Sequence, residues 1–520
     1  MICPGSRSTP LALACVERPE LTLHVRIDER SAGFFAIGRA LVTGLPVAIV
    51  VTSGTAAAEL HACVAEADQA FVPLLVVTAD RPPELHGVGA PQTIDQHELF
   101  SSMVRRFEDP GVADLGANGG WRDLARRLWA SARGSASTSG PVHLNAAFVE
   151  PLVAPPLELP IRTDFETSTP TAPPVSRPID LGGQRVLCVV GRGVDPEVIR
   201  QCTAMNWVVL GDATTLGSLP YFDSILRSEA FAKRARPDVV VRLGGICASK
   251  VLQETLRRWG VRTIAFEGAG YVSDPDRLVG ESVPGLPERH SLADERYFTM
   301  WSDASKLVED WLGTMEAPGA ALAESMVARI CVAESSQRGV PLVVGSSMPV
   351  REVEWWSPTR RSSTFSNRGV NGIDGVVSTI LGVAAGSAAI GLVGDITMLH
   401  DVSGLVDGLG STGGSCVLVV VDNRGGGIFS FLSQAKLVDH DRFETLFATP
   451  RPHDLTKVAR AFGHRGEAVR TQGELREAIG RGLQSPGLTV LVVEVASREQ
   501  NVLLHDLWNA TVVELLGDGE

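Results

Sequence analysis

The sequence predicts an α/β protein built from three doubly wound parallel-sheet domains. The chain has 520 residues, which is too long for one hydrophobic core. Hydrophobic residues make up 44% and charged residues 21%, a composition typical of a soluble globular protein. Short apolar segments alternate with helical segments along the whole chain, and this alternation favours parallel sheets with helices on both faces.

The first α/β segment is predicted over residues 1–150. Apolar runs with strand character alternate there with runs rich in alanine and glycine that have helical character. We expect strands within 21–27, 46–55 and 72–82, and helices within 29–42 and 56–70.

A linker and two further α/β segments follow. Residues 151–180 contain eight prolines and are predicted to be a linker. Residues 181–317 form the predicted central domain, and residues 318–520 the third domain. Their expected strands lie within 184–193, 206–213, 237–245, 261–268, 339–347, 388–395, 416–423 and 488–496. Ligands of open α/β sheets bind beyond the carboxyl ends of strands, so residues after these strands are the candidates for a site.

Charge and cysteine usage exclude several classes of protein. The net charge is −13, which argues against a nucleic-acid partner because such a partner needs a basic face. No apolar run has the length of a membrane span, and no signal-peptide pattern is present. The eight cysteines are scattered without a C-x-x-C pair. We therefore expect a cytoplasmic protein with reduced cysteines and neither disulfides nor a zinc site.

Two glycine-rich motifs fail as dinucleotide-binding sites. The sequence "GLGSTG" at 408–413 fits G-x-G-x-x-G but precedes a predicted strand instead of following one. The sequence "GRGVDP" at 191–196 follows a strand but lacks the third glycine. Structural turns are the better interpretation of both.

Polar residues follow two strands of the third segment. Asp395 ends one strand, and Asp422 and Asn423 end the next. Adjacent parallel strands would bring Asp395 and Asn423 to the same edge of the sheet, where Mg²⁺ could take a carboxylate and an amide oxygen. Gly425, Gly426 and Gly427 would then allow close approach of a diphosphate to the backbone. Ordinary strand-to-loop turns explain the same residues, and pattern alone leaves both interpretations open.

The spacing of Gly394-Asp395 and Asn423 resembles the motif of the thiamine-diphosphate enzyme superfamily, and so does the three-domain layout. A narrower resemblance is to the 2-succinyl-5-enolpyruvyl-6-hydroxy-3-cyclohexene-1-carboxylate (SEPHCHC) synthase family of menaquinone biosynthesis. The matching stretches are "CPGSRSTPLALA" (3–14), "RIDERSAGFFAIG" (26–38), "VTSGTAAAEL" (51–60), "ADRPPEL" (79–85), "SNRGVNGIDG" (366–375), "GDITMLHD" (394–401) and "DNRGGGIFSFL" (422–432). The resemblance implies the thiamine-diphosphate-binding fold, with pyrimidine, central and diphosphate domains.

The resemblance implies a cofactor site for thiamine diphosphate and Mg²⁺ or Mn²⁺. Glu29 matches the glutamate that activates the aminopyrimidine ring, and Ile373 matches the apolar residue that props the cofactor into its bent shape. The implied metal ligands are Asp395, Asn423 and the Gly425 carbonyl, with Gly394 and Gly426 nearby. Asp422 drops out of the metal site, because the alignment on "GGGIF" places Asn423 there.

The resemblance also implies the substrates 2-oxoglutarate and isochorismate. The implied reaction is decarboxylation of 2-oxoglutarate and 1,4-addition of the succinyl carbanion equivalent to isochorismate, and both dicarboxylates suit arginine forks. Arg351 and Arg368 match catalytic arginines on the 2-oxoglutarate side, with Ser347 nearby. The implied isochorismate side consists of Ser6, Arg7, Arg81 and Gln92.

The same resemblance implies a homodimer or homotetramer whose active sites combine two subunits. Alternatives are another carboligase similar to acetolactate synthase, or a truncated relic without activity. Pro91 and Arg424 depart from the family pattern. Only two residues precede "CPGSR", where the family normally has a helix and most of a first strand. We therefore expect an exposed sheet edge and poor folding unless another element compensates.

Overall fold

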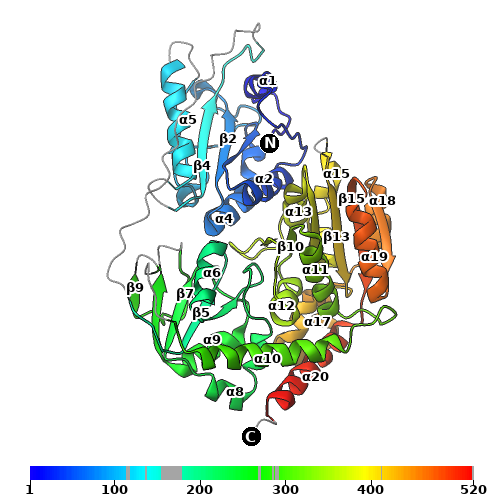
Figure 1. Ribbon diagram of the computed structural model, residues 1–520. Helices are drawn as coiled ribbons and strands as arrows, with labels where there is room; N and C mark the ends of the chain where they lie inside the picture. The colour runs from blue at the N-terminus through cyan, green and yellow to red at the C-terminus, as the bar shows by residue number, and fades with distance from the viewer. Residues whose placement is uncertain are drawn as a thin grey trace. The chain divides into compact units, whose positions relative to one another are not determined.

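The structure is a computed structural model that describes residues 1–112, 118–134, 138–153, 179–266, 271–283, 286, 292–410 and 413–517 (Figure 1). The chain divides into two compact units. Unit 1 comprises Met1–Thr171, Asn367–Ser387 and His400–Gly414. Unit 2 comprises Ala172–Ser366, Ala388–Leu399 and Ser415–Glu520. The units are described one at a time.

Unit 1 contains a parallel sheet in the order β1-β2-β4-β3. Its strands are β1 (Val47–Val51), β2 (Leu74–Asp80), β4 (Pro141–Ala147) and β3 (Phe107–Glu108). Ile2 adds a single bridge to Val50 on one side and to Val25 on the other. The strand predicted within 21–27 is therefore wrong, because pairing there is limited to Val25. Met1–Cys3 nevertheless bond along β1, through Met1 N to Ala48 O and Cys3 N to Val50 O.

Two helices of unit 1 pack against each other at glycines. The helix α2 (Glu29–Thr43) begins after Asp28, whose carboxylate accepts a hydrogen bond from Ser31 N at 2.9 Å. The second helix is α13 (Val376–Ala384). A Cβ atom at Gly38 would collide with Thr379 O, and one at Gly382 would collide with Phe35 O. The small residues of "ERSAGFFAIG" thus allow the two helix backbones to approach closely.

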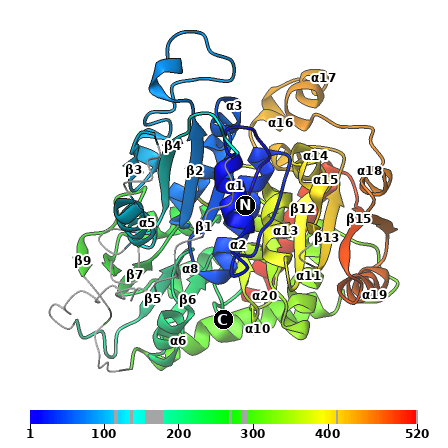
Figure 2. The same ribbon diagram turned by 90° about the horizontal axis from the view of Figure 1, so that it is seen from above.

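Two of the remaining helices of unit 1, α4 and α5, pack against its sheet. Figure 2 shows α5 beside the sheet formed by β1, β2 and β4. The helix predicted within 56–70 is divided in two at Glu59 and Leu60. The elements are α1 (Thr9–Val16), α3 (Thr55–Ala58), α4 (His61–Ala70), α5 (Asn118–Ala132) and α15 (Gly404–Asp407), with short 3₁₀ turns at Pro83–Leu85 and Ser101–Met103.

Unit 2 contains two parallel sheets, of which the first occupies the central part of the chain. Its order is β6-β5-β7-β8-β9. The strands are β5 (Val186–Val190), β6 (Val208–Gly211), β7 (Val239–Leu243), β8 (Arg262–Phe266) and β9 (Glu281–Val283). The helices are α6 (Pro196–Ala204), α7 (Phe222–Ile225), α8 (Glu229–Arg234), α9 (Lys250–Trp259) and α10 (Glu295–Gly313). "GRGVDP" forms the turn from β5 into α6, where Asp195 caps the helix.

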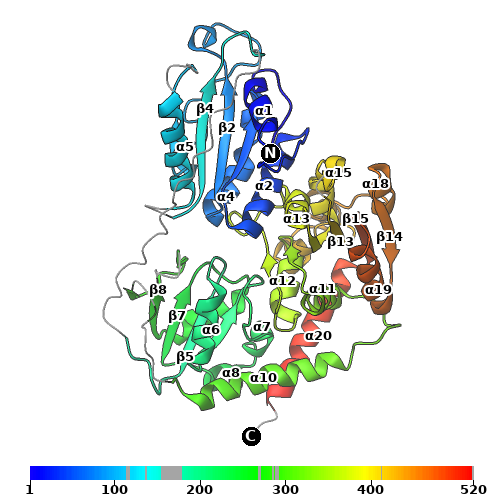
Figure 3. The same ribbon diagram turned by 45° about the horizontal axis from the view of Figure 1, so that its top comes forward.

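The second sheet of unit 2 has the order β11-β10-β12-β13-β15-β14. Figure 3 shows its strands β13, β15 and β14 with α19 close to them. Its strands are β10 (Leu342–Val344), β11 (Thr364–Phe365), β12 (Ala388–Gly394), β13 (Ser415–Asp422), β14 (Arg465–Val469) and β15 (Gly487–Glu494). The helices that accompany it are α11 (Glu324–Arg338), α12 (Met348–Trp356), α14 (Asp395–His400), α16 (Gln434–Leu437), α17 (His440–Phe443), α18 (Leu455–Ala461), α19 (Gln472–Leu483) and α20 (Arg498–Gly517), with a 3₁₀ helix at Gly427–Phe431 and a π-helix at Glu444–Ala448.

The three parallel sheets confirm the predicted fold class. In the described part of the chain, no helix is both long enough and apolar enough to span a membrane. Most of the predicted linker lies outside the described residues, and so do two residues of "GLGSTG". The domain boundaries at 150, 181 and 318 remain predictions.

Candidate active site

Asp395 and Asn423 meet at the carboxyl edge of the second sheet of unit 2. The strands that precede them, β12 and β13, are direct neighbours in the sheet. Both side chains are buried, at 6% and 8% exposure. Asp395 accepts hydrogen bonds from Ile396 N and Gly425 N, both at 2.8 Å. Desolvation raises the pKa of Asp395 to about 7. A cation bound beside the carboxylate would lower this pKa again, because an opposite charge favours the ionised form.

Glu324 fixes the orientation of the Asn423 amide. The Asn423 Nδ2 group donates to Glu324 Oε1 at 2.8 Å, and Glu324 is only 4% exposed. Because the nitrogen is used, Asn423 Oδ1 is left buried without a hydrogen-bond partner. A buried acceptor without a partner is unfavourable unless a ligand occupies it. This oxygen and the Asp395 carboxylate fit a divalent cation.

The number of side-chain ligands suits a magnesium-type site. No cluster of three or more His, Cys, Asp or Glu side chains with metal-binding geometry occurs among the described residues. Mg²⁺ commonly takes one or two protein carboxylates and fills its remaining positions with water and phosphate oxygens. One carboxylate, one amide oxygen and a backbone carbonyl would therefore suffice.

The turn after Asn423 requires glycine. Gly425 has φ +134°, and a Cβ atom there would collide with Ala448 O. Gly426 N donates to the same carbonyl at 2.7 Å. Nearby, Arg498 Nη2 donates to both carboxylate oxygens of Glu444, the first residue of the π-helix that ends at Ala448, at 2.7 and 2.9 Å. At Gly394, by contrast, a Cβ atom would meet nothing within 4 Å, so the space beside Asp395 is open.

Asp422 and Arg424 take part in the turn and not in the cluster. Asp422 Oδ1 accepts a hydrogen bond from Arg424 N at 3.1 Å. Arg424 has φ +61° and its side chain is exposed. Asp422 therefore acts as a turn residue, in keeping with its exclusion from the metal position.

Arg351 and Ser347 lie at the start of α12. Ser347 adopts φ +73°, a strained conformation for a residue with a side chain. Its carbonyl accepts a hydrogen bond from Arg351 Nη1 at 2.6 Å. Arg351 also lines a cavity of about 660 Å³ whose wall includes three further cations, a histidine and two acids, namely Arg227, Lys250, Lys436, His505, Asp223 and Asp506. This cavity can accept an anionic ligand.

Glu29 is the first residue of α2 in unit 1 and is half-buried. Desolvation raises its pKa, and the neighbouring charges of Asp28 and Glu59 add to the rise. A carboxyl group that keeps its proton more readily is suited to donating a hydrogen bond to a ring nitrogen.

Arg368 and Ile373 also belong to unit 1, in the loop before α13. The buried carboxylate of Glu66 accepts hydrogen bonds from Gly369 N at 2.6 Å and Val370 N at 2.8 Å. This pair of bonds holds the loop from the side of α4. The side chains of Arg368 and Ile373 are both half-buried.

Arg7 and Arg81 form a cationic pair at the carboxyl edge of the first sheet. Arg7 Nη1 donates to Phe148 O at 2.9 Å, and Nη2 lies 3.3 Å from Glu150. Desolvation lowers the pKa of Arg81, and the nearby charge of Arg7 contributes to the decrease. Two arginines that repel each other favour an anionic ligand.

Ser6 directly precedes Arg7 in the sequence, and Gln92 follows Pro91, which Arg81 contacts. The side chains of Ser6 and Gln92 are both exposed. Gln92 has φ +56°, and its carbonyl accepts a hydrogen bond from Ser53 Oγ at 3.0 Å. Pro91 departs from the family pattern, but its backbone still holds Arg81, because Arg81 Nη2 donates to Pro91 O at 3.2 Å.

The predicted site residues therefore fall into two groups. Unit 2 holds the predicted metal and diphosphate residues together with two residues predicted for 2-oxoglutarate (Gly394, Asp395, Asn423, Gly425, Gly426, Ser347, Arg351). Unit 1 holds the predicted pyrimidine and isochorismate residues together with Arg368, predicted for the 2-oxoglutarate side (Glu29, Ile373, Ser6, Arg7, Arg81, Gln92, Arg368). Sequence reasoning missed Glu324, Glu66 and Arg498, because their partners lie far away in sequence or in loops without a pattern. The sequence signal that could have found Glu324 is its place in the first turn of a helix, where an acidic residue is favourable.

Comparisons with known proteins support the resemblance. Residues 1–99 match the thiamine pyrophosphate enzyme N-terminal TPP binding domain, and residues 347–493 match the C-terminal TPP binding domain. SEPHCHC synthase from Myxococcus xanthus is 36% identical, with 100% of this chain and 95% of that protein covered. The synthase from Thermobifida fusca is 37% identical, covering 93% and 91%. The synthase from Geobacillus kaustophilus is 34% identical, covering 99% and 95%.

Proposed function

The chain belongs to the SEPHCHC synthase family of thiamine-diphosphate enzymes, and we propose that it joins 2-oxoglutarate to isochorismate with loss of CO₂. The product of this reaction is SEPHCHC, an intermediate of menaquinone biosynthesis. The buried Asn423 Oδ1, which has no hydrogen-bond partner, is the observation that carries the proposal, because a divalent cation held with Asp395 would satisfy it.

The cofactor half of the proposal uses unit 2. Asp395, Asn423 and the Gly425 carbonyl would hold Mg²⁺ or Mn²⁺, and the glycine turn would admit the diphosphate. When bound, thiamine diphosphate supplies the nucleophilic carbon and stores the electrons released with CO₂. Glu29 would donate a hydrogen bond to the pyrimidine ring, and its raised pKa supports that role.

The substrate half of the proposal uses arginines. Arg351 would bind a carboxylate of 2-oxoglutarate in the cavity of unit 2, where the four cations of the wall outnumber its two acids, Asp223 and Asp506. Arg368 would orient the four-carbon fragment. Arg7 and Arg81 would bind the carboxylates of isochorismate, with Ser6 and Gln92 donating further hydrogen bonds. Holding both substrates in this way replaces a bimolecular encounter with a local reaction.

The proposal extends to assembly and location. Glu29 and Asp395 belong to different compact units, and a homodimer or homotetramer would let Glu29 of one chain and Asp395 of another serve one cofactor. All eight cysteines are free, which supports a reducing compartment such as the cytoplasm. Residues 1–150, 181–317 and 318–520 are proposed as the pyrimidine, central and diphosphate domains.

A coupled assay tests the proposed function. The protein is incubated with thiamine diphosphate, Mg²⁺ and 2-oxoglutarate, with and without isochorismate, and CO₂ and isochorismate are both measured. We expect CO₂ release in equal amount to isochorismate consumption. Absence of CO₂ release, or release without isochorismate consumption, would reject the synthase. Pyruvate as sole substrate should give no acetolactate, and its formation would favour a carboligase similar to acetolactate synthase.

A further inference from the structure

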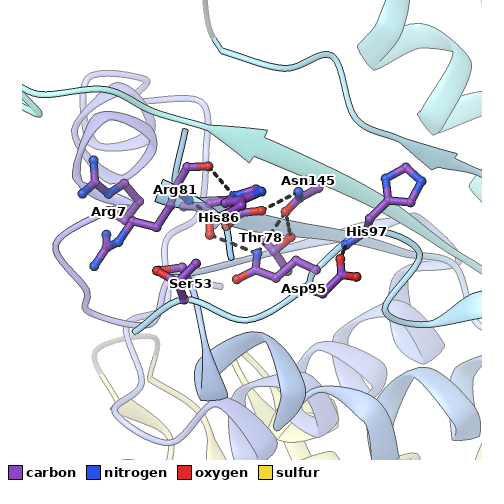
Figure 4. A network of polar contacts seen from close by, with 12 residues as sticks. Arg7, Ser53, Thr78, Arg81, His86, Asp95, His97 and Asn145 are labelled. Carbon is purple, nitrogen blue, oxygen red and sulfur yellow. Dashed lines mark hydrogen bonds and ion pairs between the residues drawn. The ribbon is translucent and has the colours of Figure 1, made fainter. Parts of the chain in front are cut away.

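A buried polar network lies at the carboxyl ends of β2 and β4 in unit 1 (Figure 4). Its central members are Thr78, Asp80, Gln96, His143 and Asn145, each no more than 2% exposed. A polar cluster this deeply buried in a sheet would be costly unless every group were paired, so its pairing pattern is informative.

Asn145 is the centre of the network. Its Oδ1 accepts hydrogen bonds from Thr78 Oγ1 and Gln96 Nε2, both at 2.9 Å. Its Nδ2 donates to Asp80 Oδ2 at 2.8 Å and to Asp109 Oδ2 at 3.1 Å. All four hydrogen-bonding positions of the amide are used, so the side chain can be held in only one orientation.

Thr78 and His143 complete the network, and the donor and acceptor of each of their hydrogen bonds can be assigned. The Thr78 hydroxyl has one proton, which it donates to Asn145, so it accepts from His143 Nε2 at 2.8 Å. His143 Nδ1 has no hydrogen-bond partner. Burial lowers the pKa of His143 to about 4, and the neutral ring matches this arrangement.

The network reaches two of the segments that carry proposed isochorismate residues, namely those of Arg81 and Gln92. The carboxylate of Asp80 accepts a hydrogen bond from Arg81 N at 2.7 Å. Gln96 Oε1 accepts from Gly54 N at 2.8 Å, and Gln96 Nε2 also donates to Ala79 O at 3.2 Å. Through Gly54, Gln96 fixes the loop in which the neighbouring Ser53 bonds to Gln92 O.

We infer that Gln96 and Asn145, fixed between β1, β2 and β4, are positioning residues that set Arg81 and the Gln92 loop for binding the enolpyruvyl dicarboxylate isochorismate. This inference rests on the proposed function. Neither side chain needs to touch the substrate, since each acts through Asp80 or Gly54. Residues in such fixed networks hold substrate-binding groups within the narrow tolerance that affinity requires.

The test compares Asn145→Ala and Gln96→Glu with the wild type as holoenzyme with thiamine diphosphate and Mg²⁺. Two quantities are measured: the KM for isochorismate in the complete reaction, and CO₂ release from 2-oxoglutarate alone with ferricyanide as electron acceptor. We expect the KM for isochorismate to rise at least about tenfold in each variant, which corresponds to about 1.4 kcal/mol. The rate of CO₂ release with ferricyanide should differ from that of the wild type by less than about twofold.

Tyr221→Phe is the matched control. Tyr221 is fully buried in unit 2, and its hydroxyl accepts from Arg329 Nη1 at 2.7 Å, so its loss also removes a buried polar contact. It should leave the KM for isochorismate unchanged. An unchanged KM in the network variants, or equal losses in both reactions, would overturn the inference. If Asn145→Ala does not fold, Gln96→Glu decides. Wild-type protein without CO₂ release would instead overturn the proposed function.

Discussion

The group around Asp395 in unit 2 and the group around Arg81 in unit 1 are built in different ways. Asp395, Asn423 and Glu324 are all less than one-tenth exposed. Asn423 bonds to Glu324, and Asp395 bonds to the backbone two residues after Asn423. Ser6 and Gln92, by contrast, are exposed, whereas Arg7 and the network that holds the Arg81 and Gln92 loops are buried. The proposed cation site of unit 2 is therefore buried and rigidly held, whereas unit 1 offers exposed loops that are held by a buried network.

The largest expected effect comes from Glu29→Gln, which should impair proton exchange on the cofactor without impairing cofactor binding. Glu29→Gln should slow exchange of the thiazolium proton of bound thiamine diphosphate by about a thousandfold, because the carboxyl proton is lost. Exchange into D₂O followed by NMR measures this rate, and Mg²⁺-dependent cofactor binding should persist. Glu59→Gln, an exposed neighbour, is the control. Exchange at the wild-type rate in Glu29→Gln would remove Glu29 from catalysis.

Asp395→Ala should give the converse result. Removal of the only carboxylate among the proposed ligands should weaken cation binding by on the order of a hundredfold or more. Titration of Mn²⁺ followed by electron paramagnetic resonance reports free metal directly and does not require turnover. The account would be wrong if Asp395→Ala bound Mn²⁺ as tightly as the wild type.

Glu324→Ala should have a smaller effect on the same titration. Loss of the acceptor for Asn423 Nδ2 frees the amide to rotate, and outer partners of metal ligands typically contribute about 10- to 100-fold in affinity. Glu334→Ala is the matched control, because Glu334 is also buried on α11 but pairs with Arg338 and Arg476. Equal Mn²⁺ affinities of the two variants would show that Glu324 does not position Asn423.

The smallest expected effect concerns pH and the network of unit 1. The folded-state pKa of His143 is about 4, below the ordinary 6.5, so the unfolded chain binds a proton first as pH falls. His143 therefore stabilises the fold above pH 6.5, and this stability is lost between pH 6.5 and 4, by about 2 kcal/mol at pH 5. His143→Gln should flatten the dependence of the unfolding free energy on pH in that range. An identical slope in the variant would contradict the assignment of a neutral buried His143.

The difference between the two groups also explains what the sequence could predict. Asp395 and Asn423 follow strands 28 residues apart, and such strands were expected to be neighbours, as β12 and β13 are. Glu324 lies 99 residues from Asn423, and no local pattern links them. The strand β4 was missed because Pro141, His143 and Asn145 interrupt its apolar run, although the last two form the network. The three sheets followed from periodicity, whereas these distant polar contacts required the fold.

Isotope labelling of the product tests the central claim most directly. Wild-type protein is supplied with thiamine diphosphate, Mg²⁺, isochorismate and uniformly ¹³C-labelled 2-oxoglutarate, and the products are analysed by mass spectrometry. The account predicts one labelled carbon in CO₂ and the other four in an adduct that retains the enolpyruvyl group of isochorismate. Labelled succinic semialdehyde without an adduct, or an unlabelled isochorismate product, would contradict it.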